Sequence, residues 1–219
     1  GKTAPPTANR ALRLVRHMLN VAVDDGILSA SPLASMPSLF KEASRDRVLA
    51  DEEIRTLWRT LDEAPARRDI AVSHLPCVAI RLCLILGARV GDVAAIEAAE
   101  VDPITRVWTI PATRFKGRRA HTLPLSDAAV EQLERAFEAP FGQWQGHAFK
   151  NAKHDGQPID RMSITRAMQR VTLAAKMARA TPHDLRRTMA TLMASERIGT
   201  APHVVTAVLG HTADGTKVT

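Results

Sequence analysis

The chain has 219 residues, of which 45% are hydrophobic and 24% charged, and its formal net charge is +7. This length suggests one or two domains. Ordinary numbers of glycine (11) and proline (13) and only two cysteines disfavour a disordered chain, a collagen-like repeat and a disulfide scaffold. The longest uncharged stretches fall short of the roughly 20 apolar residues that span a bilayer. We therefore expect a globular protein without a membrane span.

The excess positive charge is concentrated in two segments. Residues 103–126 contain five basic and no acidic residues, and residues 161–187 contain seven basic residues against the single acid Asp184. Solvated helix faces would account for either segment alone. Two such segments favour a polyanionic partner, and nucleic acid in particular.

The two cysteines, Cys77 and Cys83, lie six residues apart in an apolar segment and form no CxxC pair. This spacing disfavours zinc and redox roles, so we expect both side chains to be buried. Free thiols fit a reducing, cytoplasmic setting. Neither a metal site nor a cofactor site is predicted.

Near the N-terminus, apolar residues recur at helical spacing and predict an amphipathic helix over residues 7–25 that ends near Gly26. A single helix cannot bury a core of its own. Residues 1–40 are therefore expected to be the end of one domain followed by a proline-containing linker, with the main domain over residues 41–219.

The main domain is predicted to be mainly α with a small antiparallel β-sheet. Apolar spacing, first-turn acids and capping residues predict helices that open at Asp51, over 70–86 with Pro76 as a kink or true start, from about Asp92, over 126–137 capped by Ser126, over 163–177 capped by Ser163, over 182–195 with Pro182 in the first turn, and over 202–209 ending at Gly210. The β-prone runs 107–110 and 122–125 flank a basic segment over 114–119 and predict a hairpin.

The most informative motif is the run from Thr181 to Thr188, TPHDLRRT. His183 and Arg186 lie three residues apart near a helix N-terminus, so both project from one face beside free backbone N–H groups. This arrangement suits a phosphate. A capping histidine and a solvated arginine are the alternative explanation.

Three further positions join this motif. Arg89 lies in a glycine-flanked turn, GARVGD, after an apolar helix. Lys116 lies in the basic connection between the two predicted strands, and His211 follows a helix end in the run LGH. A surface arginine, a hairpin lysine and a C-capping histidine would explain each position singly, but their joint order indicates a common site.

In this order the residues resemble the tyrosine recombinase family, which includes the phage integrases. The family pattern is an Arg in a turn, a Lys in a β-hairpin, a His-x-x-Arg helix, a second His and a Tyr nucleophile. The matching residues are Arg89, Lys116, His183, Arg186 and His211. The resemblance covers about residues 41–219 and implies a tyrosine recombinase catalytic fold there. It also implies that residues 1–40 are the C-terminal remnant of a core-binding domain plus its linker.

The resemblance implies site-specific recombination of double-stranded DNA, by integration or excision, through a 3′-phosphotyrosine intermediate. Arg89 and Arg186 would hold the scissile phosphate, and His211 would donate a further hydrogen bond. His183 would assist proton transfer from the nucleophile, and Lys116 would protonate the departing 5′ oxygen. The phosphotyrosine bond conserves the energy for religation, so no cofactor is needed. A homotetramer on DNA is implied for the full-length protein.

The sequence contains no tyrosine and stops eight residues after His211. We expect the nucleophile just past Thr219, absent here through truncation or proteolysis, and a natural inactive relative is the alternative. By itself this chain is therefore expected to be inactive in cleavage.

Three other functions stay open on the sequence. A type IB topoisomerase would relax supercoils without a specific site, and a non-catalytic DNA-binding protein of the same fold would bind but never cleave. A basic helical module for RNA or protein would not bring the five residues together. Asp92 and Asp184 would orient the arginine or histidine of the site, or are solvated acids at helix starts.

Overall fold

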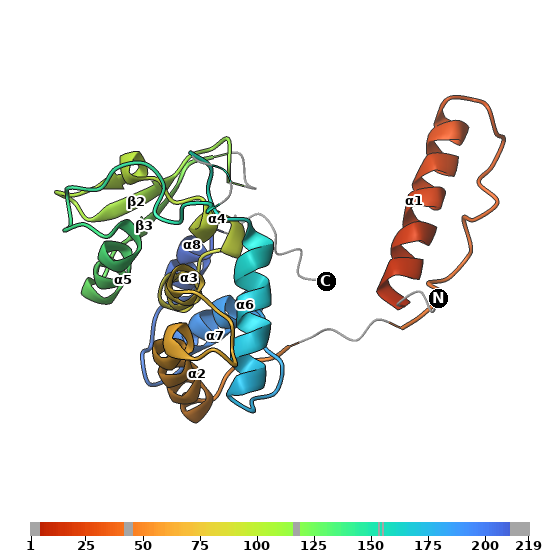
Figure 1. Cartoon of the computed structure of the whole chain (residues 1–219). Coiled ribbons are helices and arrows are strands. Elements are labelled where there is room, and N and C mark those ends of the chain that lie inside the picture. Colours follow the sequence, from red (N-terminus) through yellow and green to blue (C-terminus); the bar gives the residue numbers. More distant parts are fainter. Residues whose placement is uncertain (1–4, 42–45, 116–118, 153, 155, 211–219) are drawn as a thin grey trace. The chain divides into compact units, whose positions relative to one another are not determined.

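A computed structural model describes residues 5–41, 46–115, 119–152, 154 and 156–210 of the chain (Figure 1). The chain divides into two compact units, Gly1–Asp46 and Arg47–Thr219. Helices dominate both units, and the second unit also holds a small sheet. Within the described ranges, no helix combines the length and apolar character that a bilayer crossing requires.

The first unit consists of helix α1 (Pro5–Asp24) and a segment that returns along it. The buried Asn9 side chain holds this return, because its amide donates to the Phe40 carbonyl (2.8 Å) and accepts from the Phe40 N–H (3.1 Å). Arg16 Nε also donates to the Leu33 carbonyl at 3.2 Å. The predicted N-terminal helix is confirmed. Part of its apolar stripe, including Met18, is exposed within this unit.

The second unit is mainly helical with one antiparallel sheet, as predicted. Its elements are α2 (Asp51–Glu63), η1 (Ala64–Ala66), α3 (His74–Leu86), α4 (Val90–Ala94), η2 (Ala98–Glu100), β1 (Val101–Asp102), β2 (Val107–Ile110), β3 (His121–Pro124), α5 (Asp127–Phe137), α6 (Arg161–Ala174), α7 (Pro182–Ala194) and α8 (Pro202–Val208).

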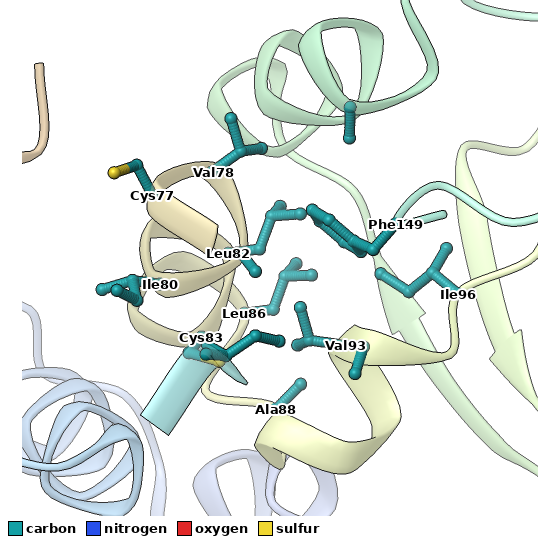
Figure 2. Packing of buried hydrophobic residues seen from close by; sticks show 14 of the residues in the cluster. Cys77, Val78, Ile80, Leu82, Cys83, Leu86, Ala88, Val93, Ile96 and Phe149 are labelled. Atoms are coloured by element: carbon teal, nitrogen blue, oxygen red, sulfur yellow. The ribbon is translucent and has the colours of Figure 1, made fainter. Parts of the chain in front are cut away.

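Helix α3 forms the centre of the second unit, with α2, α5, α6 and α7 packed around it (Figure 1). Figure 2 shows Leu82 of α3 among side chains from other elements, including Phe149 and Ile96. Cys77 and Cys83 are buried and free, as predicted, and burial raises the pKa of the Cys83 thiol to about 12. Both cysteines therefore act as small apolar side chains of the core.

The sheet has the order β1-β2-β3, and all its pairs are antiparallel. In the register of β2 and β3, Val107 pairs with Pro124 and Ile110 pairs with His121. Trp108 and Leu123 point into the core from the same face. The predicted hairpin is therefore confirmed, and the short strand β1 adds a third strand to it.

Two predicted helix starts are wrong. Helix α3 begins at His74, not near Ile70, because Ala71 adopts a left-handed conformation (φ 51°) and Pro76 suits only the first turn. Helix α6 begins at Arg161, because Asp160 rather than Ser163 caps it, accepting from the Met162 N–H at 3.0 Å.

Candidate active site

Arg89 is held by the junction between two helices. Gly87 ends α3 in the left-handed conformation (φ 57°), and Arg89 is the N-cap residue of α4. On either side of Arg89 the side chains of Ala88 and Val93 are buried in the core (Figure 2). The backbone of Arg89 is therefore fixed, while its side chain stays one-third exposed (33%).

The Arg89 guanidinium group lies beside a carboxylate and an aromatic ring. Nη1 lies 3.8 Å from Oδ2 of Asp92, and Cζ lies 4.8 Å from the centre of the buried Phe115 ring. Among the described residues, Nη1 has no hydrogen-bond acceptor. The fold thus positions this guanidinium group without satisfying the donors of Nη1.

Arg186 projects from α7 toward the same junction, and its side chain is almost fully buried. Nη1 donates to the Gly87 carbonyl at 2.5 Å, and Nη2 donates to the Leu209 carbonyl just after α8. Burial lowers the pKa of Arg186 to about 10, and the nearby charge of Arg89 acts in the same direction. The two arginines are therefore close enough to repel each other.

One carboxylate, that of Asp92, interacts with both arginines. It is 7% exposed, so the alternative of a solvated helix-start acid is wrong for this residue. Burial raises the pKa of Asp92, whereas Arg89, Arg114 and Arg186 lower it. Two guanidinium groups beside one carboxylate leave a net positive charge that attracts an anion.

The start of α7 is fixed by a reciprocal capping box. The Thr181 N–H and hydroxyl each donate to Oδ2 of Asp184 at 2.8 Å. Asp184 is 2% exposed, so it is not a solvated acid, and Thr181 rather than His183 caps the helix. His183 lies exposed on the first turn, one helical turn before Arg186.

The structure brings Arg89 and Arg186 together and places His183 on the same helix as Arg186. Lys116 and His211 fall at 116–118 and 211–219, outside the described residues. Described neighbours of both segments, Phe115 and Gly210, contact each other, since a Cβ on Gly210 would lie 2.3 Å from Cζ of Phe115.

Sequence reasoning missed an aromatic pair at this site. Phe115 and His121 are buried and stacked, with ring centres 4.6 Å apart. An available signal was the alternation of His121, Leu123 and Leu125, which places the histidine on the buried face of the sheet.

Arg114, in the basic segment, is not available to a ligand as a free cation. Its guanidinium group forms two 2.7 Å hydrogen bonds with the Glu100 carboxylate and donates to the Ala95 carbonyl at 2.8 Å. The part of the chain that the structure describes contains no cluster of three or more His, Cys, Asp or Glu side chains able to hold a metal ion.

Solved structures of integrases share this fold. The chain is similar to a lambda integrase tetramer bound to a Holliday junction, with 17% identity, 98% of this chain and 62% of that chain covered, and a TM-score of 0.73. It is also similar to the Tn1549 transposon integrase in complex with a circular intermediate DNA, with 16% identity, 96% and 72% coverage and a TM-score of 0.71. The fold is the tyrosine recombinase catalytic fold.

Sequence comparison gives the family. The profile of the phage integrase family matches residues 47–218, and the chain belongs to that family. It is 24% identical over 207 residues to prophage integrase IntA of Escherichia coli (strain K12), covering 94% of this chain and 47% of the relative. It is 25% identical over 226 residues to tyrosine recombinase XerC of Chlorobaculum parvum, covering 94% and 66%. The chain spans about half the length of IntA.

Proposed function

We propose that this chain supplies the phosphate-activating site of a site-specific DNA recombinase that integrates or excises DNA. The observation that carries the proposal is the pair Arg89 and Arg186, held beside the single buried carboxylate of Asp92. In this proposal residues 41–219 form the catalytic domain. Residues 1–40 are the end of a core-binding domain with its linker.

The arginine pair suits the transition state of phosphodiester cleavage. Negative charge grows on the non-bridging oxygens as the nucleophile attacks, and guanidinium groups held in place neutralise it without reorganising. Arg186 is held in place by the carbonyls of Gly87 and Leu209. These two residues are 122 positions apart in sequence, so the tertiary fold sets the position of both carbonyls. Arg89 lies at the more exposed edge, where a DNA phosphate can reach it.

The other site residues complete the proposed reaction. A tyrosine hydroxyl attacks the scissile phosphorus, with His183 assisting the transfer of its proton and His211 donating a hydrogen bond to the phosphate. The P–O5′ bond breaks, and the departing 5′ oxygen takes a proton from Lys116. Attack by a 5′ hydroxyl on the 3′-phosphotyrosine bond reverses these steps and rejoins the strand. The 219 residues contain no tyrosine, so this chain alone is proposed to bind DNA without forming the adduct.

Basic residues of α6 support double-stranded DNA as the partner. Cδ of Arg161 lies 3.9 Å from where a Cβ on Gly91 would be, next to the turn that holds Arg89. Further along α6, the exposed Arg166 and Arg170 line a cavity of about 190 Å³ near the start of α3. These cations extend the positive charge away from the arginine pair. The lambda integrase structure is a tetramer on a Holliday junction, and we propose a tetramer on DNA for the full-length protein.

The test of the reaction uses the complete polypeptide that the gene encodes and a duplex carrying its recombination site. A nick near the scissile phosphate lets the short 5′-hydroxyl product diffuse away, so the covalent protein–DNA adduct accumulates. We expect this adduct with the unmodified protein and with Arg55→Ala, since Arg55 pairs with Glu52 on an exposed face of α2. Arg89→Ala and Arg186→Ala should each reduce adduct formation about 100-fold or more. No adduct with the unmodified protein contradicts the proposal.

The test of the partner needs only this chain. Its affinity for a duplex should fall with salt, with a log–log slope of roughly −0.9 for each phosphate contacted. Arg161→Ala should make that slope less steep by roughly 0.9, the value for one phosphate contact, whereas Arg55→Ala should not change it. An affinity that does not depend on salt contradicts DNA as the partner.

A further inference from the structure

The buried aromatic pair Phe115 and His121 lies where the basic segment leaves and rejoins the sheet. Phe115 follows β2 and is 3% exposed, and His121 opens β3 and is 9% exposed. Their rings stack with centres 4.6 Å apart and planes 27° apart. Both residues contact groups that hold the arginine pair, and the reaction proposed above gives neither of them a role.

Phe115 contacts the first arginine directly. The guanidinium carbon of Arg89 lies 4.8 Å from the centre of the Phe115 ring, within the range of a cation–π interaction. Asp92 lies beside the same guanidinium group, with Oδ2 3.8 Å from Nη1. The ring therefore restricts the directions that the Arg89 donors can face.

His121 acts on the second arginine through the backbone after α8. Nε2 of His121 lies 3.1 Å from the Val208 carbonyl, and the next carbonyl, that of Leu209, accepts from Nη2 of Arg186. Because a carbonyl can only accept, Nε2 of His121 carries the proton. The bond therefore holds the peptide group directly before the one that anchors Arg186.

The two halves of this arrangement meet at Gly210. Its backbone is left-handed (φ 60°), and an added Cβ would lie 2.3 Å from Cζ of Phe115 and 3.2 Å from the His121 ring. The absence of a side chain therefore lets the chain after α8 pack directly on both rings. Through Gly210 the ring that orients Arg89 and the peptide that anchors Arg186 form one packed unit.

We infer that Phe115 and His121 are positioning residues that fix the orientation of Arg89 relative to Arg186. The inference rests on the proposed function, in which both arginines bind one scissile phosphate. The pair touches neither DNA nor the reacting atoms in this scheme. It acts by holding the two guanidinium groups at the separation that one phosphate requires.

The experiment measures single-turnover cleavage of the nicked duplex by the complete polypeptide, and DNA affinity separately. Phe115→Leu keeps an apolar side chain but loses both ring contacts. We expect its cleavage rate to fall about tenfold or more, with duplex affinity changed less than about twofold. His121→Leu should likewise lose cleavage rate and keep its duplex affinity. His121→Gln should recover most of the cleavage rate, because its amide N–H can donate to the Val208 carbonyl.

A second substrate separates positioning from general loss of structure. Replacing the scissile phosphate by an uncharged methylphosphonate removes the charge that the arginines neutralise. On this substrate the cleavage rates of Phe115→Leu and His121→Leu should approach the rate of the unmodified protein. The inference is overturned if the variants lose the same factor in cleavage rate on both substrates. It is also overturned if His121→Leu cleaves the phosphate substrate at a normal rate. His121→Leu provides the test if Phe115→Leu does not fold.

Arg89→Ala distinguishes the failure of this inference from the failure of the proposed function. Normal cleavage by Arg89→Ala contradicts the proposed function itself. If Arg89→Ala is inactive while Phe115→Leu and His121→Leu cleave normally, only the positioning role is overturned.

Discussion

Arg81 and Arg186 are both buried in helices of the second unit, yet their surroundings differ in charge. Arg81, on α3 and 2% exposed, forms an ion pair with Asp62, and its guanidinium carbon lies 5.2 Å from the centre of the Trp58 ring. Arg186, on α7 and 8% exposed, donates to two backbone carbonyls beside a second arginine.

This difference teaches how to separate a structural arginine from one that is proposed to bind a ligand. Both pKa values are lowered by burial, so that shift does not distinguish them. The neighbouring charges do: the largest charge effect on Arg81 comes from Asp62, which raises its pKa, whereas the largest on Arg186 comes from Arg89, which lowers its pKa against the opposing effect of Asp92. The fold neutralises the first charge, while the second is anchored by neutral carbonyls and shares Asp92 with Arg89.

The largest effect is expected from Arg186→Lys. A lysine keeps the positive charge, but one ammonium group cannot reach the carbonyls of Gly87 and Leu209 and also face a phosphate in the fork geometry of arginine. Cleavage of the nicked duplex should fall about 100- to 1,000-fold. Arg81→Lys is the matched control and should cleave within about twofold of the unmodified protein. Equal losses in the two variants would remove the distinction between the two arginines.

The next effect concerns stability. Arg81→Ala should lower the free energy of unfolding by about 2–3 kcal/mol, because it leaves a cavity and removes the contact with Trp58. Arg81→Met should recover most of that loss, since methionine refills the space and Asp62, with 56% of its side chain exposed, stays hydrated. Denaturant titration measures both. A loss as large in Arg81→Met as in Arg81→Ala would mean that the ion pair, not the packing, stabilises this region.

A smaller effect is expected from inorganic sulfate. At about ten times its Kd, sulfate bound between Arg89 and Arg186 should stabilise the folded chain by about 1.4 kcal/mol, which raises Tm by roughly 2–4 °C for a chain of this size. In Arg186→Ala the excess over chloride at equal ionic strength should shrink to the part caused by general exclusion of sulfate from protein surfaces, which acts on both variants alike. In Arg81→Met it should persist in full, because Arg81 is not part of the proposed sulfate site.

The smallest effect is a dependence of stability on pH. Burial lowers the pKa of His121, and the charges of Arg186, Arg89 and Arg119 lower it further, whereas the Val208 carbonyl raises it. Because the unfolded chain then binds a proton more readily than the folded one, stability should fall as pH drops below 6.5 and level off below the folded pKa. The difference between the unmodified protein and His121→Gln across this window isolates the contribution. A difference that does not change with pH contradicts it.

Local signals in the sequence were enough to predict most elements of the fold. Ser126 caps α5 as predicted, accepting from the Ala129 N–H at 3.3 Å, because a hydroxyl before a helical run satisfies a free donor within three residues. The predicted start of α6 was wrong because Asp160 and Ser163 are both suitable caps, and only the structure shows which of them accepts the hydrogen bond. The predicted start of α3 was wrong because Ala71 is left-handed, and an alanine, unlike a glycine, gives no sequence signal of that conformation.

In the candidate site too, local spacing could be predicted from the sequence, whereas contacts between distant residues could not. The spacing of His183 and Arg186 was readable because helical geometry fixes which residues share a face. The contact of His121 with Val208 joins residues 87 positions apart, and no local pattern encodes it. Phe115 was likewise missed, because its contacts with Arg89 and Gly210 depend on how the hairpin packs against α4 and α8.

Gly87 has a consequence for anyone who randomises this protein to change the DNA target proposed for it. Its carbonyl serves Arg186, and an added Cβ would lie 2.9 Å from Sδ of Met189, on the same helix as that arginine. Because the backbone of Gly87 is left-handed (φ 57°), any other residue there would be strained, and a library that varies Gly87 would disturb the carbonyl that anchors Arg186. Exposed positions of α6 such as Gln169 offer diversity without that penalty.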